Sequence, residues 1–356
     1  MKGVDSLNCT FGTDPEYLIV DPKDKPIPAH KVKFPSAKRK HELPGYDHSK
    51  AFRDGYAVEI NVSPATCRQT LTFEMQRALI EVVKMLPPGH KLATVPAWQI
   101  DLKQMQGAPS DVKQFGCSPS LCAYTGAQKI PPIDAMTHEW RYSGAHLHFS
   151  AYWEEGGYDS ASDTYCMVPL PKEIQDPKLY PDMVKLMDVY LGLPLTCLFH
   201  RPELYQRRRF YGQAGEYRAQ DYGDFVDDEG QKQHSRGLEY RTPGPELWNL
   251  PWVASLALSI GRYIISNRAR LMKRYDKEYG EAVRNAIDTG EDRWKLLRWL
   301  PGTRYTPSLW RHLYLHRPYE STPYDLISAT SVDITNGFYH WFMATGKKKP
   351  GKGKTD

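Results

Sequence analysis

The sequence of 356 residues has few cysteines, which excludes a fold held together by disulfides. The six cysteines are Cys9, Cys67, Cys117, Cys122, Cys166 and Cys197. Cys117 and Cys122 have CxxxxC spacing, but no second pair completes a zinc site. We therefore expect buried or free thiols in a reducing compartment.

Long hydrophobic runs are missing as well. The longest run, Trp252 to Ile260, is far shorter than the roughly 20 residues that span a bilayer. The first 17 residues contain no apolar stretch typical of a signal peptide. These absences predict a soluble, cytoplasmic protein with no membrane partner.

The common nucleotide-binding and hydrolase motifs are also absent. The sequence contains no GxxxxGK[ST] loop, no GxGxxG that opens a helix after a strand, and no GxSxG or HExxH. If the protein uses ATP, it must therefore hold the phosphates through metal ions and arginines.

The composition is that of an ordinary globular protein. Lysine and arginine total 47 and aspartate and glutamate total 42, which gives a net charge of +5. Hydrophobic residues make up 40% and charged residues 25% of the chain. Part of the positive excess is local, because five lysines lie within residues 347–356. We expect residues 343–356 to form a disordered basic tail.

Short segments of alternating polarity predict strands at 16–21, 57–62, 145–150 and 238–242. Apolar stripes at helical spacing predict helices at 70–86, 181–191 and 252–275, and 276–290 reads as an exposed helix. Gly192 is expected to end the second helix, and the polar segments 22–50 and 220–236 are expected to be loops. Strands and helices without regular βαβ alternation indicate an α+β fold. We expect a catalytic domain at 1–250, with a helical section at 251–342 packed on it.

Alternation along each predicted strand places polar side chains on one face and apolar ones on the other. The polar positions are Asp14, Glu16, Glu59, Asn61, His146, His148, Glu239 and Arg241. On any single strand this pattern is also typical of a face that meets solvent. Four such strands, if they share one sheet, instead favour a common polar site.

Carboxylates gathered in this way need counter-cations. Two of them about 5 Å apart repel by roughly 3 kcal/mol at an effective dielectric of about 20. Oxygen ligands with an imidazole suit Mg²⁺ or Mn²⁺ better than zinc. Such cations can bridge protein acids to the phosphates of a nucleoside triphosphate.

Residues 207–218, with the sequence RRRFYGQAGEYR, form the most basic motif outside the tail. Guanidinium groups bind phosphate through two hydrogen bonds and keep their charge. Alternatively the segment is a solvated basic loop or an RNA-binding patch, since Phe210, Tyr211 and Tyr217 are interleaved with the basic residues. No recognised nucleic-acid-binding motif accompanies it.

Six motifs occur in a characteristic order: FGTDPEYLIVD, DGYAVEINVSPA, FGCSPSLCAYTG, YSGAHLHFS, RRRFYGQAGEYR and GLEYRTPG. Together they resemble the phage-type carboxylate–amine ligases, the COOH–NH2 ligase type 2 family of phiEco32-like phages. That family is similar to the glutamine synthetase and glutamate–cysteine ligase superfamily. The resemblance covers about residues 11–250. It implies an antiparallel catalytic sheet like that of glutamine synthetase, which forms a polar cavity and has helices packed on its outer face.

The resemblance also implies roles for individual residues. The implied metal ligands are Asp14, Glu16, Glu59, His146 and Glu239. Asp14 stands where the family has Glu, and no further acidic partner of Glu59 is matched. His148, Arg208 and Arg218 are implied to bind nucleotide phosphate. The implied catalytic residues are Arg218, Glu239 and Arg241, with Arg241 as the transition-state clamp.

The implied reaction is ATP-dependent formation of an amide bond, peptide or isopeptide, with Mg²⁺ or Mn²⁺ and an acyl-phosphate intermediate. The substrates would be a small-molecule or peptide carboxylate and an amine, with Glu239 or Glu59 as proton acceptor. A phage-encoded enzyme would act in the cytoplasm of the infected bacterial host.

Two alternatives stay open at this point. One is a guanidino or other small-molecule phosphotransferase of the same superfamily. The other is a non-catalytic virion or nucleic-acid-binding protein that keeps the fold, although an acidic cavity repels nucleic acid.

Overall fold

A computed structural model describes residues 9–43, 49–113, 119–129, 133–150, 158–159, 164–165, 172–226, 232–300 and 326–327. Three parts of the sequence analysis lie outside these ranges. They are Cys117, the expected basic tail at 343–356, and the expected helical section after residue 300 apart from residues 326–327.

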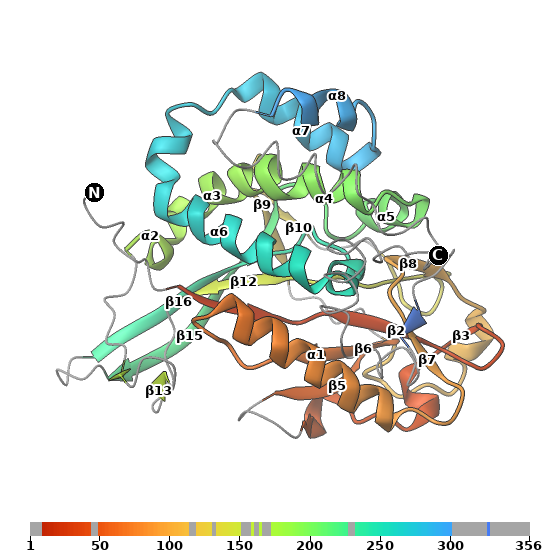
Figure 1. The fold of residues 1–356 in the computed structure, drawn as a ribbon. Helices are drawn as coiled ribbons and strands as arrows, with labels where there is room; N and C mark the ends of the chain where they lie inside the picture. Colours follow the sequence, from red (N-terminus) through yellow and green to blue (C-terminus); the bar gives the residue numbers. More distant parts are fainter. Residues whose placement is uncertain are drawn as a thin grey trace, which may run out of the picture.

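Six antiparallel strands form the first sheet. In spatial order they are β1 (Thr10–Thr13), β12 (Leu147–Ser150), β16 (Lys232–Tyr240), β15 (Glu216–Val226), β9 (Ser120–Cys122) and β10 (Gln128–Lys129). The long β15–β16 hairpin extends away from the body of the molecule (Figure 1). The sequence predicted a loop at 220–236, and this was wrong. The polar composition there belongs to two paired strands rather than to a loop.

A second sheet is built around the segment that follows β1. Its strands are β17 (Leu326–Ile327), β7 (Lys91–Ala93), β2 (Glu16–Val20), β6 (Ala57–Asn61), β5 (Lys50–Asp54) and β4 (His41–Glu42), and β3 (Pro26–Ile27) also pairs with β2. Two small pairs are β8 (Ala97–Gln99) with β11 (Trp140–Tyr142), and β13 (Tyr158–Asp159) with β14 (Thr164–Tyr165).

The chain passes from the first sheet to the second at Asp14 and Pro15, between β1 and β2. Backbone hydrogen bonds hold this junction from both sides. The N–H of Glu16 donates to the carbonyl of Gly144 (2.8 Å), and the N–H of Ile60 donates to the carbonyl of Pro15 (3.0 Å). The predicted polar strands therefore lie on two sheets that are joined between β1 and β2, and not on one.

The four predicted helices are present as α1 (Arg68–Met85), α3 (Tyr180–Met187), α6 (Pro251–Met272) and α7 (Lys277–Thr289). Shorter helices are α2 (Lys172–Gln175), α4 (Leu193–Leu198), α5 (Pro202–Arg208) and α8 (Arg293–Arg298). Single 3₁₀ turns are η1 (Ala29–Val32), η2 (Ala37–Arg39), η3 (Leu102–Met105), η4 (Pro177–Leu179) and η6 (Pro245–Asn249). The segment 22–50, expected to be a loop, therefore contains only short elements.

Gly192 does not end the second predicted helix. The chain continues from α3 through a π-helical turn, η5 (Asp188–Gly192), into α4. Gly192 lies against β16, where a Cβ would come within 2.6 Å of the Tyr240 hydroxyl oxygen. The glycine therefore permits close packing of the helical segment on the sheet. In the sequence alone, a glycine needed for close packing cannot be told from one that ends a helix.

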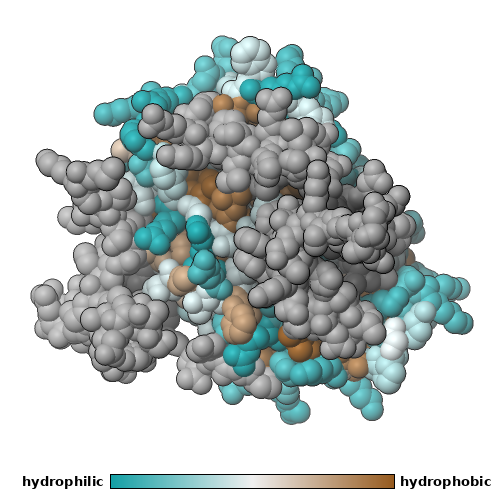
Figure 2. Space-filling model, in the orientation of Figure 1, coloured by the Kyte–Doolittle hydropathy of each residue, from teal (hydrophilic) through white to brown (hydrophobic). Residues whose placement is uncertain are grey.

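The main core lies between the first sheet and the helices. Apolar side chains of β1, β12 and β16 pack in one buried cluster with apolar side chains of α1, α3 and α6. Figure 1 shows α3, α4, α6, α7 and α8 stacked above this sheet, with α1 crossing beside it. On the face shown in Figure 2, hydrophilic residues cover the upper helical edge, whereas hydrophobic residues show near the middle. The fold is α+β, as predicted.

None of the helices in the described part of the chain combines the length and the apolar character that crossing a bilayer requires.

The packing of α6 on β12 generates the first prediction. A Cβ on Gly261 of α6 would overlap the ring of Phe149, which is fully buried and packs edge-on against Phe11 at 6.2 Å between ring centroids. Alanine favours a helix by about 1 kcal/mol over glycine, but this ring has no room to move. We expect Gly261→Ala to destabilise the protein by about 1–3 kcal/mol in urea unfolding.

Ser266→Ala is the matched control, because Ser266 is exposed on the same helix. It should change the unfolding free energy by no more than about 0.5 kcal/mol. Equal stability of the Gly261→Ala protein and the wild type would contradict the close packing of α6 on β12.

Candidate active site

Four positions of the first sheet form a row on its polar face. Gly12, His148, Glu239 and Arg218 lie directly opposite one another on β1, β12, β16 and β15. Side chains paired in this way stand about 5 Å apart. The strand register thus brings a histidine, a carboxylate and a guanidinium together.

Asp14, His146, His148 and Glu239 form the first cluster, in which one ligand atom of each lies within 4.8 Å of the others. The Nδ1 of His146 is 2.9 Å from the Oδ1 of Asp14 and 3.3 Å from the Oε1 of Glu239. The Nε2 of His148 is 3.1 Å from the Oδ2 of Asp14. The described structure thus brings together the aspartate and both histidines that the sequence singled out.

Three atoms of this first cluster approach one another without hydrogen-bond geometry. The Oδ1 of Asp14, the Nδ1 of His146 and the Nε2 of His148 are buried, yet none has a hydrogen-bond partner. Buried polar atoms normally have partners. Lone pairs that converge on a common point are the arrangement that a bound cation requires, and the mixture of carboxylates and imidazoles fits Mg²⁺ or Mn²⁺.

Glu16, Asp54 and Glu59 form the second cluster, also with ligand atoms within 4.8 Å of one another. Glu16 lies directly opposite Glu59 in the pairing of β2 with β6. Asp54 is on β5, opposite Ala57, which puts it on the same face as Glu59. Asp54 is the acidic partner of Glu59 that the motif comparison did not supply.

The sequence contained a signal for Asp54. Asp54 is the last residue of β5, and Gly55 and Tyr56 form the two-residue turn to β6, in which Gly55 has a φ of 54°. Recognising this hairpin would have extended the alternation of Glu59 across the turn to Asp54.

Crowding of acids raises pKa values in the second cluster. Burial, with the charges of Asp54 and Asp14, raises the pKa of Glu16 to about 8, although Arg241 and Arg207 oppose the shift. Burial and the same neighbouring acids raise the pKa of Glu59 well above its usual value. The second cluster without a cation therefore favours protonated acids.

In the first cluster the histidines change the balance. Burial alone would raise the pKa of Asp14, but the charges of His146 and His148 lower it. The pKa of Glu239 is likewise lowered against the effect of burial, by His146 and Arg241. Burial lowers the pKa of His146, whereas the Asp14 carboxylate raises that of His148 despite burial. The carboxylates of this cluster are thus held in their charged, ligating form.

The two arginines nearest Glu239 differ in exposure. Arg241 is 1% exposed and forms ion pairs with Glu239 and with Glu216, whose Oε1 is 3.3 Å from its Nε. The side chain of Arg218 is 20% exposed, and its Nη1 is 3.5 Å from the Oε1 of Glu239. Arg218 therefore lies where a substrate can reach it, whereas Arg241 braces Glu239 from behind.

Arg208, named from the sequence as a phosphate ligand, is not brought to either cluster. It is 3% exposed and donates to the carbonyl of Ile287 on α7. Its neighbour Arg207 reaches the site instead, and donates to the carbonyls of Arg241 (2.9 Å) and Thr242 (3.0 Å). The helix α5 sends these consecutive residues in different directions, which a run of three arginines does not reveal.

Sequence reasoning also missed Tyr211 as a site residue and treated it only as a possible RNA-stacking ring. Tyr211 is 5% exposed, and its hydroxyl lies 3.1 Å from both carboxylate oxygens of Glu16. The same hydroxyl contacts the Nε2 of His146. Tyr211 thus touches a member of each cluster.

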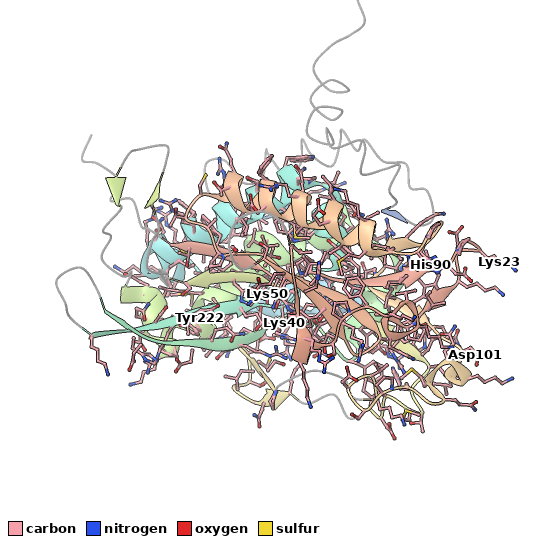
Figure 3. The ribbon with its side chains drawn as sticks, turned by 90° about the horizontal axis from the view of Figure 1, so that it is seen from below. Lys23, Lys40, Lys50, His90, Asp101 and Tyr222 are labelled. Carbon is pink, nitrogen blue, oxygen red and sulfur yellow. The ribbon has the colours of Figure 1, made fainter. Side chains whose placement is uncertain are left out.

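Basic side chains flank the second cluster. Lys40 acts on Asp54 and Glu59 and lowers their pKa values against the larger effect of burial, and its Nζ lies 4.2 Å from the centre of the Phe52 ring. Lys40, Lys50 and Tyr222 are all visible on the face shown in Figure 3. The side chains of Asp14 and His148 are 21% and 16% exposed, so solvent can reach the first cluster.

Comparison with known families gives one match. Residues 176–304 match the model of the family described as Phage phiEco32-like COOH.NH2 ligase-type 2. This match confirms the resemblance that the motifs indicated. The matched segment contains Arg218, Glu239 and Arg241, whereas the motifs around Asp14, Glu59 and His146 precede it.

Solved structures give distant likenesses. A bifunctional glutathione synthetase from Pasteurella multocida has 13% sequence identity and a TM-score of 0.44, over 96% of this chain and 50% of that one. The complex between prokaryotic ubiquitin-like protein Pup and its ligase PafA gives 11% identity and a TM-score of 0.36, over 96% and 70%. The chain spans about half the length of the glutathione synthetase. No curated protein sequence matches it.

The raised pKa values predict how stability depends on pH. Burial and neighbouring carboxylates raise the pKa of Glu16 from 4.5 to about 8, so the folded protein holds a proton that the unfolded chain releases. The contribution of this proton to the stability of the folded protein is complete below about pH 4.5 and is lost as the pH rises towards 8. We expect cation-free protein to lose at least about 1 kcal/mol of unfolding free energy between pH 6 and pH 8, measured with urea in the presence of a chelator.

Glu59→Gln should reduce this loss, because it removes a second buried acid whose pKa is raised. Glu42→Gln is the control, since the side chain of Glu42 is 79% exposed on β4 of the same sheet. A wild-type protein that becomes more stable from pH 6 to pH 8 would refute the raised pKa.

Proposed function

We propose that this chain is an ATP-dependent carbon–nitrogen ligase that joins a carboxylate to an amine. The observation that carries the proposal is the pair of adjacent clusters, each with ligand atoms within 4.8 Å of one another. In the first cluster three of these buried atoms have no hydrogen-bond partner. The family match at residues 176–304 supports the same class of reaction.

Each cluster would hold one divalent cation. Asp14, His146 and Glu239, with His148 beside them, would hold the first, and Glu16, Asp54 and Glu59 the second. A divalent cation held there, Mg²⁺ or Mn²⁺, would neutralise charge on the phosphates of ATP.

The reaction then has two steps. A substrate carboxylate oxygen attacks the γ-phosphorus, the bond to the β-phosphate oxygen breaks, and ADP leaves. The amine nitrogen next attacks the acyl carbon of the acyl phosphate, the bond from carbon to the phosphate oxygen breaks, and inorganic phosphate leaves. The amine proton passes to a carboxylate of the protein.

The chain's own residues contribute position and charge. Arg218 is partly exposed beside Glu239 and is the guanidinium placed to bind the transferring phosphoryl group. His148 lies in the same row of the sheet and would contact nucleotide phosphate. Arg241 fixes the position of Glu239 from its buried side.

Glu239 and Glu59 are the two candidates for the proton acceptor. Glu239 already accepts hydrogen bonds from Arg241 and Gln220, which occupy both of its oxygens. Glu59 has a pKa raised by burial and by neighbouring acids, which makes it the stronger base of the two. We therefore propose Glu59 as the acceptor.

The test is a screen for ADP release over amino acids, polyamines and peptides, with Mg²⁺ or Mn²⁺, followed by mass spectrometry of the products. A ligase yields an amide and free phosphate. A phosphorylated acceptor without an amide would make the protein a phosphotransferase. Salt-sensitive binding of RNA or DNA with no ATP turnover would favour the non-catalytic alternative.

Asp14→Asn should lower ATP turnover by about 100-fold or more, because it removes the carboxylate that contacts both histidines and would bind the first cation with them. Asparagine keeps the shape of the side chain, so circular dichroism should show an intact fold. Asp224→Asn is the matched control on the exposed end of β15 and should retain turnover. Full activity of the Asp14→Asn protein would rule out the first cluster as the catalytic one.

A further inference from the structure

Tyr211 occupies a buried position between the two clusters. The guanidinium groups of Arg207 and Arg241 lie over its ring, 4.5 and 4.9 Å from the ring centre. The ring meets that of His146 edge-on, at 5.6 Å between centroids. Packing thus fixes the ring on several sides and leaves the hydroxyl between His146 and Glu16.

Two glycines make this position possible. A Cβ on Gly144 would come within 3.0 Å of both the Tyr211 hydroxyl and the Nε2 of His146. Gly144 also donates its N–H to the Oε2 of Glu16 (2.8 Å). Gly212, with a φ of +67°, turns the chain immediately after Tyr211. The backbone is therefore shaped to admit the contact of tyrosine, histidine and glutamate.

The protons of this contact can be assigned. The Nδ1 of His146 faces Asp14 and Glu239, so it is the atom that would bind a cation. A neutral imidazole that ligates through Nδ1 carries its hydrogen on Nε2. That hydrogen is donated to the Tyr211 oxygen, and Tyr211 donates its own hydrogen to Glu16.

We infer that Tyr211 is a positioning residue that couples the two cation sites. A carboxylate of Glu16 that binds a cation only accepts hydrogen bonds, so the Tyr211 hydrogen points towards it. The Tyr211 oxygen is then open to the Nε2–H of His146, which leaves Nδ1 free to bind the other cation. Each cation favours the hydrogen-bond arrangement that the other needs, and by linkage the coupling is reciprocal.

The inference rests on the proposed function only in taking both clusters as cation sites. It goes further because it assigns a role to a side chain that ligates neither cation. Outer hydrogen bonds to metal ligands commonly change metal affinity by about 10–100-fold.

The experiment measures Mn²⁺ binding to cation-free protein by the electron paramagnetic resonance signal of free Mn²⁺, without ATP. Wild-type protein should bind two ions with a Hill coefficient above 1. Tyr211→Phe keeps the ring and both stacked arginines but removes the hydroxyl. It should lower the affinity about 10–100-fold and abolish cooperativity.

Tyr180→Phe is the matched control. Tyr180 is also fully buried, and its hydroxyl donates to the carbonyl of Ile174 (2.6 Å), away from both clusters. Tyr180→Phe should lose a buried hydrogen bond and some stability but keep cooperative Mn²⁺ binding. Cooperative binding retained in Tyr211→Phe would overturn the coupling.

A second variant tests the coupling without altering Tyr211. Glu59→Gln removes a ligand of the second cluster, and should weaken Mn²⁺ binding at the first cluster by about 5-fold or more in the wild-type background. The same change in the Tyr211→Phe background should leave the first cluster unaffected. Unchanged Mn²⁺ affinity of the first cluster in the single Glu59→Gln variant would also overturn the coupling.

The two proposals can fail separately. Wild-type protein that turns over ATP but binds two Mn²⁺ ions independently would overturn the coupling and leave the ligase standing. Cooperative Mn²⁺ binding without turnover of any carboxylate and amine pair would overturn the ligase and leave the coupling standing.

Discussion

The passage of the chain from one sheet to another at Asp14 and Pro15 is the constraint on which the candidate site depends. Within three residues the backbone leaves β1, makes hydrogen bonds to Gly144 and Ile60, and enters β2. Alternation then places Asp14 among the histidines of the first sheet and Glu16 opposite Glu59 in the second. A single acidic pair thereby contributes to two clusters, and the distance between the clusters is fixed by backbone hydrogen bonds.

The rest of the fold stabilises this junction from the apolar side. Acids buried side by side repel one another, and the cation-free site opposes folding through that repulsion. The favourable term comes from the core between the first sheet and α1, α3 and α6, where the strand faces opposite the acids are fully buried. Close contacts such as Gly261 against Phe149 bring helix and sheet together. Repulsion among buried groups at one site, offset by a well-packed apolar core, is the pattern expected of a functional centre.

The arginines show how tertiary position changes the meaning of a charge. In sequence Arg207, Arg208 and Arg218 look alike as phosphate ligands. In the structure Arg207 is stacked on Tyr211 and bonded to two carbonyls, and Arg208 is bonded to α7. Arg218, on β15 beside Glu239, is the one of the three that pairs with a cluster carboxylate and is also partly exposed. Two of the three charges therefore support the architecture of the site rather than meet its substrate.

The sequence by itself determined the α+β class, the long helices, and which face of each strand is polar. It did so because apolar periodicity is a local property that each segment carries alone. It also indicated the family, through motifs at Asp14, His146, Arg218 and Glu239. Only the tertiary structure decided that the strands divide between two sheets, that Asp54 joins Glu16 and Glu59, and that Tyr211 lies between the clusters. These features depend on strand pairing and on contacts between residues far apart in the chain, and periodicity within a segment does not record which partners it will meet.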